Sequence, residues 1–405
     1  MPEEFDCFLS YAREDKPLAE RIFIRLRRHG IRVWMDKPPQ PYASEGLVLG
    51  ANWNDVLHAQ IKNARLFLPL FTTTGVESGS YFEHELKTAL TIGSETPDRR
   101  DFIIPILSGG VVPQLNVAGK SFGAFQWVDI EADGLNALLR HLLSIQPATT
   151  GSSSRDTLDV ATVDQLIDAV GPNRIIRLSP GDYDLSKIKE SSHDFMSIEP
   201  EFDGPQVIFH NLKNTEFYCD GPEPAHLFVE PRYTFPFYLS NCEEIKLRNL
   251  RFGHSPEPGE CVGGVVKIVR SRTIDLNECD LYGCGTVGLE LDHAENVVVS
   301  NSLIRDCNLG FAAIESCRDV VLHNCTLRDN AINSGFEIGN SDNIRIVNTL
   351  FQDNTGNEFF AAETPLVVSN RSTNVALEGC RIMKSPFVHV VDAAQGIEVL
   401  RCEVY

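Results

Sequence analysis

The carboxy-terminal part of the chain repeats one pattern of apolar and polar positions seven times. Each copy begins with Ile or Val, carries a second apolar residue two positions later, and carries a third seven positions later. The copies start at Ile245, Ile274, Val297, Val320, Ile344, Val375 and Ile397, at steps of 29, 23, 23, 24, 31 and 22 residues. The alternation predicts strands with one buried face, and a period in this range indicates stacked structural repeats.

Two polar columns run through these repeats. The fourth position after the start holds Asn in four copies, and the fifth holds a small residue in six. The columns are Asn249, Asn301, Asn324 and Asn348, and Cys279, Ser302, Cys325, Thr349, Cys380 and Cys402. Asn suits a tight bend because it tolerates left-handed backbone, and we expect the fifth position to face inward. This part of the chain resembles a right-handed parallel β-helix of the pectate-lyase-like kind, which implies an all-β domain over residues 159–405.

The region before the repeats predicts how the β-helix begins. Residues 146–158 are small and polar, which is typical of a linker. Val163–Val170 has the spacing of a short amphipathic helix, and the apolar strand in Ile175–Tyr183 follows it. Such a helix would cover the bare strand edges of the first coil. At Tyr405 the sequence ends one residue after an apolar strand position, so we expect either that another subunit covers the last coil or that the chain is a fragment.

Residues 1–145 show a different pattern, in which apolar strands alternate with amphipathic helices. The predicted strands are Phe5–Ser10, Ile31–Met35, Leu66–Phe71, Phe102–Ile106 and Phe125–Val128. The predicted helices are Leu18–Leu26, with Asp15 as its N-cap, Trp53–Asn63, Ser80–Ile92 and Leu135–Leu143. Near-continuous apolar strands that alternate with helices predict a parallel five-stranded sheet covered on both faces.

Three segments of this α/β part occur in the order and spacing of a known family. They are Phe8–Asp15, Gly30–Asp36 and Tyr81–Leu86. On these segments the domain is similar to a Toll/interleukin-1 receptor (TIR) domain of the bacterial kind, and the resemblance covers most of residues 3–145. It implies a flavodoxin-like fold. One departure is Tyr81, which stands where many members carry Trp.

The TIR resemblance also implies an activity, because many such domains cleave NAD+ at the nicotinamide–ribose bond. NAD+ would be the substrate, and no cofactor or metal is implied. Nicotinamide in NAD+ is already a cationic leaving group, so one carboxylate that stabilises the developing positive charge on the ribose is sufficient. By its position in the motif, that carboxylate is Glu85. The implied binding residues are Ser10, Tyr11, Ala12, Arg13, Trp34, Trp53 and Tyr81.

The composition argues against some classes of binding partner and indicates the cellular compartment. The formal net charge of −20 argues against nucleic acid and against an anionic membrane, because both need clustered Lys and Arg. The 11 Cys form an odd number spread through strand positions, which does not indicate a disulfide framework or a metal site. The chain opens without an apolar signal region, and no run is long enough to span a membrane. These features favour the cytoplasm.

The β-helix could carry chemistry of its own. One column of the repeats contains Lys267, Glu290, Ala313 and Glu337, which reads as an external ion-pair ladder. Another contains Asp306, Asp329 and Asp353, which could bind a cation but also suit turns whose side chains bond locally. We interpret both columns as structural, because polysaccharide-cleaving enzymes need clustered carboxylates on one exposed face.

Three functions are therefore compatible with the sequence. The first is an NAD+-cleaving effector of antiphage defence, which assembles through TIR–TIR and β-helix contacts while the β-helix serves as scaffold, sensor or oligomerisation module. The second is a non-catalytic TIR adaptor, which the departure at Tyr81 motivates. The third is a carbohydrate-active β-helix with a regulatory TIR domain. The product of NAD+ cleavage, the trigger and the subunit number are left open.

Overall fold

The computed structural model describes most of the chain. The described residues are 5–40, 42–47, 52–73, 82–95, 102–109, 116–117, 120–121, 125–130, 134–145, 155–189, 193–256, 262–283, 285–356, 365–387 and 397–405. Contacts within the chain divide it into two compact units, Met1–Ser154 and Arg155–Tyr405. Each unit has its own core, and each is described by itself.

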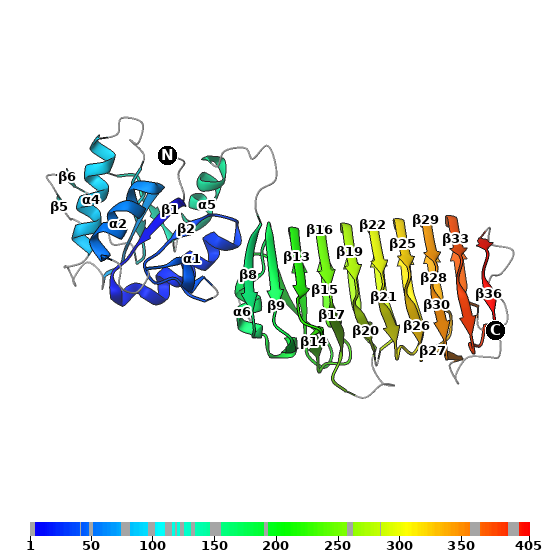
Figure 1. Ribbon diagram of the computed structural model, residues 1–405. Helices are drawn as coiled ribbons and strands as arrows, with labels where there is room; N and C mark the ends of the chain where they lie inside the picture. The colour runs from blue at the N-terminus through cyan, green and yellow to red at the C-terminus, as the bar shows by residue number, and fades with distance from the viewer. Residues whose placement is uncertain are drawn as a thin grey trace. The chain divides into compact units, whose positions relative to one another are not determined.

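Unit 1 is built on a parallel five-stranded sheet, labelled in Figure 1. Its strands, in spatial order, are β2 (Val33–Trp34), β1 (Phe5–Ser10), β3 (Ala64–Phe71), β4 (Ile106–Leu107) and β7 (Val128–Asp129). Every neighbouring pair is parallel. The central strands β1 and β3 are buried along almost their whole length, which explains their near-continuous apolar sequence.

Helices cover both faces of this sheet. One face packs against α2 (Trp53–Asn63) and α4 (Phe82–Glu95), and its core includes Phe8, Phe67 and Leu86. Two other helices among the described residues of unit 1 are α1 (Lys16–Arg28) and α5 (Gly134–Ile145), which contact each other through a 2.8 Å hydrogen bond from Arg25 Nη2 to Asn136 Oδ1. Short elements complete the unit: η1 (Arg13–Asp15), η2 (Ala43–Glu45) and the antiparallel pair β5 (Asn116–Val117) and β6 (Lys120–Ser121). The expected α/β layering is confirmed.

The outer strands of unit 1 are shorter than the sequence predicts. Only Val33–Trp34 of the expected strand Ile31–Met35 is paired as a strand. The expected strand Phe102–Ile106 is interrupted: Ile103 forms a single bridge to Phe67, and the ladder resumes at Ile106. Pro105 explains the break, since proline has no N–H to donate to a neighbouring strand.

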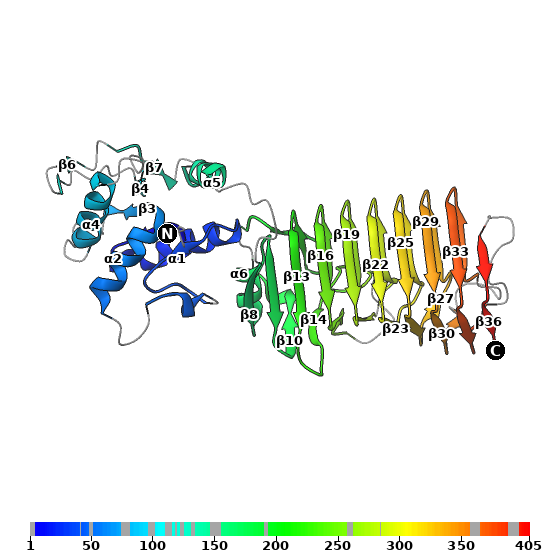
Figure 2. The same ribbon diagram turned by 45° about the horizontal axis from the view of Figure 1, so that its top comes forward.

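Unit 2 is a parallel β-helix made of three long sheets. A regular coil contributes one strand to each sheet, and strands of successive coils lie side by side, as Figure 2 shows for β13 to β33. The pairs are parallel throughout these sheets except β11 with β12, which is antiparallel. The apolar columns of the sequence face inward, where Leu322, Leu327 and Val320 are fully buried.

The strands of unit 2 have the following bounds. Sheet 1 contains, within the described residues, β8 (Asp156–Val160), β9 (Arg174–Leu178), β13 (Lys213–Cys219), β16 (Glu243–Arg248), β19 (Arg272–Asn277), β22 (Glu295–Ser300), β25 (Arg318–His323), β29 (Asp342–Val347), β33 (Thr373–Glu378) and β35 (Glu398–Leu400). Sheet 2 contains β10 (Gly181–Asp184), β14 (Ala225–Val229), β17 (Leu250–His254), β20 (Asp280–Tyr282), β23 (Leu303–Arg305), β26 (Thr326–Arg328), β30 (Leu350–Gln352), β34 (Arg381–Met383) and β36 (Glu403–Val404). Sheet 3 contains β11 (Met196–Pro200), β12 (Pro205–His210), β15 (Phe237–Ser240), β18 (Val266–Val269), β21 (Val287–Asp292), β24 (Gly310–Glu315), β28 (Phe336–Gly339) and β32 (Val367–Asn370). A small extra pair joins β27 (Ala331–Ile332) to β31 (Thr355–Gly356), and η6 (Leu185–Lys187) follows β10.

The polar columns of the repeat behave as the sequence predicts. The fourth position has positive φ in all seven copies, at Asn249, Glu278, Asn301, Asn324, Asn348, Gly379 and Arg401. Four of these are Asn and one is Gly, the residues that tolerate this backbone with least strain. The fifth position faces inward, where Cys279, Cys325 and Cys380 are buried. The bend and the buried small residue are therefore confirmed.

The boundary between the units differs from the predicted linker of residues 146–158. Strand β8 begins at Asp156 and pairs in parallel with β9, so the last three residues of that stretch already belong to the β-helix. Leu158 explains the difference, because it is buried within β8. The predicted helix is α6 (Val163–Ala169), which packs next to β8 and β9 at the first coil. The buried side chain of Arg174 donates a hydrogen bond to the carbonyl oxygen of Ala169, the last residue of α6.

Candidate active site

The candidate catalytic residue Glu85 lies on the first turn of α4, beside the carboxyl end of β1. The hydroxyl of Ser10, the last residue of β1, donates a short hydrogen bond to Glu85 Oε2. Ser10 is buried and Glu85 is partly buried. Because β1, β2 and β3 are parallel, the residues that follow all three strands meet at this edge, where ligand sites of parallel α/β sheets lie. The structure thus brings two of the predicted site residues together.

The environment of Glu85 favours its protonated form. Burial of the carboxyl group is the main cause, and it raises the pKa of Glu85 from 4.5 to about 7. The hydrogen bond from Ser10 opposes this by stabilising the charged form, whereas the nearby charge of Asp36 raises the pKa further. A carboxyl group whose pKa lies near neutral pH is a frequent feature of catalytic sites.

A second carboxylate, Asp36, faces the same edge. It follows β2 by two residues and accepts a 2.7 Å hydrogen bond from the hydroxyl of Tyr11, the residue directly after β1. Burial and the charge of Asp36 raise the pKa of Tyr11, so its hydroxyl stays protonated and remains the donor. The sequence analysis did not single out Asp36, although its place as the first acidic residue after a buried strand was a usable signal.

Asp15 and Thr72 tie β1 to β3 at this edge. The Thr72 hydroxyl, one residue after β3, donates a 2.8 Å hydrogen bond to Asp15 Oδ1. Asp15 does occupy the N-cap position of α1, but its side chain makes no capping hydrogen bond there. Its Oδ2 is buried and has no partner within the described part of the chain, and burial raises the pKa of Asp15. The predicted capping residue therefore holds two strands together instead of capping the helix.

The other predicted binding residues have different positions. Ala12 is buried at the start of η1, so only its backbone is available to a ligand, while the Arg13 side chain is exposed. Trp53 is partly buried against the core. Trp34 requires a correction: it is 3% exposed and its ring stacks on Phe8 with 4.8 Å between centroids, so it is not available to cover a nucleotide. Tyr81 lies outside the described residues.

Chemically, this edge presents three carboxyl groups, those of Asp15, Asp36 and Glu85, and three hydroxyl groups, those of Ser10, Tyr11 and Thr72. Glu85 and Asp36 can stabilise positive charge or accept hydrogen bonds from ribose hydroxyls. Among the described residues there is no group of three or more His, Cys, Asp or Glu side chains that could hold a metal ion. Two carboxylates at one edge, Glu85 and Asp36, are suited to stabilising a cationic centre.

Family models match both parts of the chain. A model described as "TIR domain" matches residues 7–143, and one described as "Right handed beta helix region" matches residues 237–404. Residues 7–143 therefore form a TIR domain, and residues 237–404 belong to a right-handed β-helix region. The predicted fold class, an α/β TIR domain followed by an all-β right-handed β-helix, is confirmed. No significant match was found among curated proteins.

Solved structures match the chain at low sequence identity and low TM-score. The Streptococcus pneumoniae surface protein and adhesin PfbA is 10% identical, covers 75% of this chain and 84% of its own, and has a TM-score of 0.35. An alginate lyase from a Paenibacillus species is 10% identical, covers 61% of this chain and 99% of its own, and has a TM-score of 0.32. The A-module of the Azotobacter vinelandii mannuronan C-5 epimerase AlgE6 is 10% identical, covers 80% of this chain and 96% of its own, and has a TM-score of 0.24. Similarities of this size carry no information about activity.

The two columns of the β-helix that the sequence singled out engage their own neighbours. Lys267 pairs with Glu290 at 2.6 Å across β18 and β21, which is the predicted ladder contact. Asp306, Asp329 and Asp353 all have positive φ, as turn residues do. Each is already contacted by the residue before it, Arg305, Arg328 or Gln352. In the described residues these three carboxylates form local contacts instead of a shared cation site.

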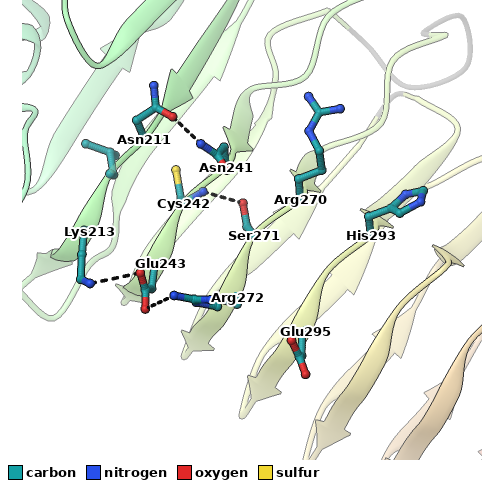
Figure 3. Close-up of a pocket in the computed structure, with 11 residues that line it drawn as sticks. Asn211, Lys213, Asn241, Cys242, Glu243, Arg270, Ser271, Arg272, His293 and Glu295 are labelled. Carbon is teal, nitrogen blue, oxygen red and sulfur yellow. Dashed lines mark hydrogen bonds and ion pairs between the residues drawn. The ribbon is translucent and has the colours of Figure 1, made fainter.

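A polar depression on sheet 1 of the β-helix, shown in Figure 3, is also accounted for by contacts between coils. Its volume is about 500 Å³. Glu243 accepts ion pairs from Lys213 of the preceding coil and Arg272 of the following one. Asn241 donates to Asn211 Oδ1 at 2.5 Å, and Ser271 accepts from the backbone of Cys242. These groups satisfy one another along the stack, so the depression is not a candidate active site. No helix in the described part of the chain is both long and apolar enough to cross a bilayer.

Proposed function

We propose that the TIR domain cleaves NAD+ at the nicotinamide–ribose bond, with Glu85 as the catalytic residue. The observation that supports this most is the partly buried Glu85 carboxyl group, held by Ser10 at the carboxyl edge of the sheet, with a pKa of about 7. Membership in the TIR family supports the substrate, since this family includes NAD+-cleaving domains. The β-helix would act as scaffold, sensor or oligomerisation module, and the resemblance to bacterial TIR effectors supports a role in antiphage defence.

In the proposed reaction, the bond between ribose C1′ and the nicotinamide nitrogen breaks. The bonding electron pair moves to the nitrogen, so the cationic ring leaves as neutral nicotinamide and positive charge develops on the ribose. An ionised Glu85 stabilises that charge, and water adds to C1′ with release of a proton. Asp36, fixed by Tyr11, adds a second negative potential at the same edge. The exposed Arg13 would contact a phosphate of the substrate.

The test is NAD+ turnover by the full-length protein, measured as nicotinamide release by chromatography over a range of protein concentrations, because assembly is part of the proposal. We expect Glu85→Gln to reduce turnover at least about 100-fold, the size seen when a key electrostatic group is removed. A matched control is His84→Gln, since His84 is the exposed neighbour on the same helix turn. Absence of turnover at every concentration, or equal turnover by Glu85→Gln, would leave the adaptor function instead.

A further inference from the structure

Two cysteines lie next to each other in neighbouring coils at the fifth position of the repeat. They are Cys380 and Cys402, and both are free thiols in the structure. Along this column the other cysteines alternate with hydroxyl residues, in the order Cys279, Ser302, Cys325, Thr349, Cys380 and Cys402. The step from Cys380 to Cys402 is therefore the place in this column where a thiol is stacked directly on a thiol.

The register of the last described coils places the two cysteines opposite each other. The amide of Glu403 donates a 2.9 Å hydrogen bond to Cys380 O, and Arg381 of β34 is paired with Glu403 of β36. Cys380 and Cys402 each precede one member of that pair. Neighbouring strands lie about 4.8 Å apart, which falls within the Cα separation of about 4.4–6.8 Å that disulfides adopt. The backbone spacing thus allows a disulfide between these residues.

The two thiol groups also point in the same direction. Cys380 Sγ lies 3.4 Å from Ile346 O, and Cys402 Sγ lies 3.7 Å from Leu377 O. Ile346 and Leu377 are paired across β29 and β33, so Leu377 O is the equivalent carbonyl one coil later. A side-chain hydrogen bond joins the two thiols. Both sulfur atoms are therefore in contact on the inner side of the same turn.

The two cysteines differ in their access to solvent. Cys380 is fully buried, whereas Cys402 is partly exposed. Burial is the main cause that raises the pKa of Cys380 to about 12, and the contact with Cys402 adds to it, so Cys380 stays protonated at neutral pH. Oxidants react with accessible thiolates. Cys402 is therefore the residue that meets an oxidant first, and Cys380 is the residue beside it that can close a disulfide.

A disulfide here would fasten the coil that contains β35 and β36. Both strands are exposed along their whole length. Strand β35 pairs with β33, and β36 pairs with β34, through short ladders. A bond between Cys380 and Cys402 closes a loop over 22 residues of sequence and so restricts the separation of this coil from the one before it.

We propose that Cys380 and Cys402 form a reversible redox site, in which a peroxide converts the two thiols into an intrachain disulfide that fixes the coil of β35 and β36 to the preceding coil. The proposal is independent of NAD+ cleavage, because both residues belong to the β-helix. It assigns a covalent modification to the outermost described coil, and a thiol reductant reverses it.

The reaction has two steps. The Cys402 thiolate attacks one oxygen of hydrogen peroxide, the O–O bond breaks, and the departing hydroxide takes up a proton as water while Cys402 becomes a sulfenic acid. The sulfur of Cys380 then attacks the Cys402 sulfur, and its proton leaves with the sulfenic hydroxyl as a second water. Two thiols are oxidised and one peroxide is reduced to two waters. Contact between the two sulfurs favours the second step, although Cys380 is protonated.

The test is peptide mapping by mass spectrometry. Full-length protein is treated with hydrogen peroxide, unfolded and alkylated without reduction, with glutathione oxidised in parallel to show that the peroxide is active. We expect a linked peptide pair that contains Cys380 and Cys402 and disappears after treatment with dithiothreitol. Both thiols still free, or Cys402 linked to a second molecule or to another cysteine, would overturn the proposal.

Serine variants test the order of the two steps. Serine fits this column, because Ser302 Oγ donates to Ser300 O much as Cys380 Sγ contacts Glu378 O. Cys402→Ser should form no disulfide, and Cys380→Ser should leave a sulfenic acid on Cys402 that dimedone traps. Cys325→Ser, in the same column, is the matched control and should form the disulfide as the wild type does. Absence of a dimedone adduct on Cys402 in folded Cys380→Ser would contradict the assigned order.

Hydrogen exchange shows whether the bond holds the coil. The amides of Glu403 and Tyr405 donate to the carbonyl oxygens of Cys380 and Ile382 in the preceding coil. We expect both amides to exchange at least about tenfold more slowly in the oxidised than in the reduced protein, because the disulfide constrains the opened state. Cys402→Ser treated with the same peroxide should show no change. Equal exchange in the oxidised and reduced wild type would refute the fixing of the coil, even where the linked peptide is found.

Discussion

The hydroxyl of Ser10 donates a hydrogen bond to the carboxyl group of Glu85, which is 75 residues further along the chain. This contact joins the last residue of β1 to the first turn of α4 and partly offsets the effect of burial on the ionisation of the proposed catalytic group. Because a hydrogen bond to the charged form lowers a carboxyl pKa while burial raises it, Ser10 and the surrounding protein act in opposite directions on Glu85.

The pH dependence of NAD+ cleavage should follow the ionisation of Glu85. The proposed mechanism needs the charged carboxylate, so kcat/KM should rise as the pH increases and level off above about 7, the pKa of Glu85 in the free protein. Ser10→Ala removes the hydrogen bond that lowers this pKa, so its acid limb should move to higher pH. Initial rates of nicotinamide release at low NAD+ concentration measure this. An acid limb near the ordinary value of 4.5 in both proteins would refute the assigned role.

The stability of the TIR domain should change with pH for the same reason. The folded pKa of about 7 exceeds the ordinary 4.5, so the folded domain binds the Glu85 proton more tightly, and its free energy of unfolding decreases as the pH rises from 4.5 to about 7. Glu85→Gln removes the free-energy cost of ionising this buried carboxyl group. It should therefore stabilise the domain by about 1–3 kcal/mol at about pH 8, with little effect at about pH 4.

Urea unfolding followed by tryptophan fluorescence checks this prediction, because all three tryptophans, Trp34, Trp53 and Trp127, belong to unit 1. The β-helix therefore does not contribute to the signal. A Glu85→Gln variant that is less stable than the wild type at about pH 8 would contradict the pKa assignment. His84→Gln again serves as the control.

The left-handed bend of the β-helix coil should limit which residues are tolerated there. Asn324 has a φ of 54°, so Asn324→Gly should leave the free energy of unfolding within about 0.5 kcal/mol, since glycine adopts this backbone freely. Asn324→Val should cost about 1–3 kcal/mol, because a β-branched residue is strained there. Far-UV circular dichroism at the strand minimum follows unfolding of the β-helix. Equal stability of the two variants would show that the bend does not select its residue.

The close approach of Gly253 and Tyr282 predicts a coupled effect on stability. Gly253→Ala places a methyl group 2.2 Å from the tyrosine ring, so the ring must move and lose its contact with His226. We expect Gly253→Ala to lower the melting temperature of the β-helix clearly. In a Tyr282→Ala background the same glycine substitution should have a much smaller effect, because the obstructing ring is gone. Additive effects of the two substitutions, measured by thermal scans of all four proteins, would contradict this geometry.

Much of the fold was predictable from local sequence. The helix Trp53–Asn63 has the predicted bounds, and the seven repeat starts mark the coils of the β-helix. Asn at the bends and buried Cys at the next position also follow from the repeat. These features depend on residues close together in the chain, whose spacing alone determines which side chains share a face. The sequence analysis also assigned Glu85 as the candidate carboxylate, but only through the resemblance to TIR domains.

The tertiary structure decided which distant residues meet and how they ionise. The burial that raises the pKa of Glu85, the nearby Asp36 and the Asp15–Thr72 contact all arise where parallel strands end at one edge of a sheet. Trp34 packs into the core because β2 presents it to Phe8, which no local pattern distinguishes from an exposed position. Likewise, Asp182, His226 and Tyr282 meet only through the register of four stacked strands, β10, β14, β17 and β20. Spacing along a chain determines periodicity, whereas desolvation and long-range hydrogen bonds exist only once strands far apart in sequence are paired.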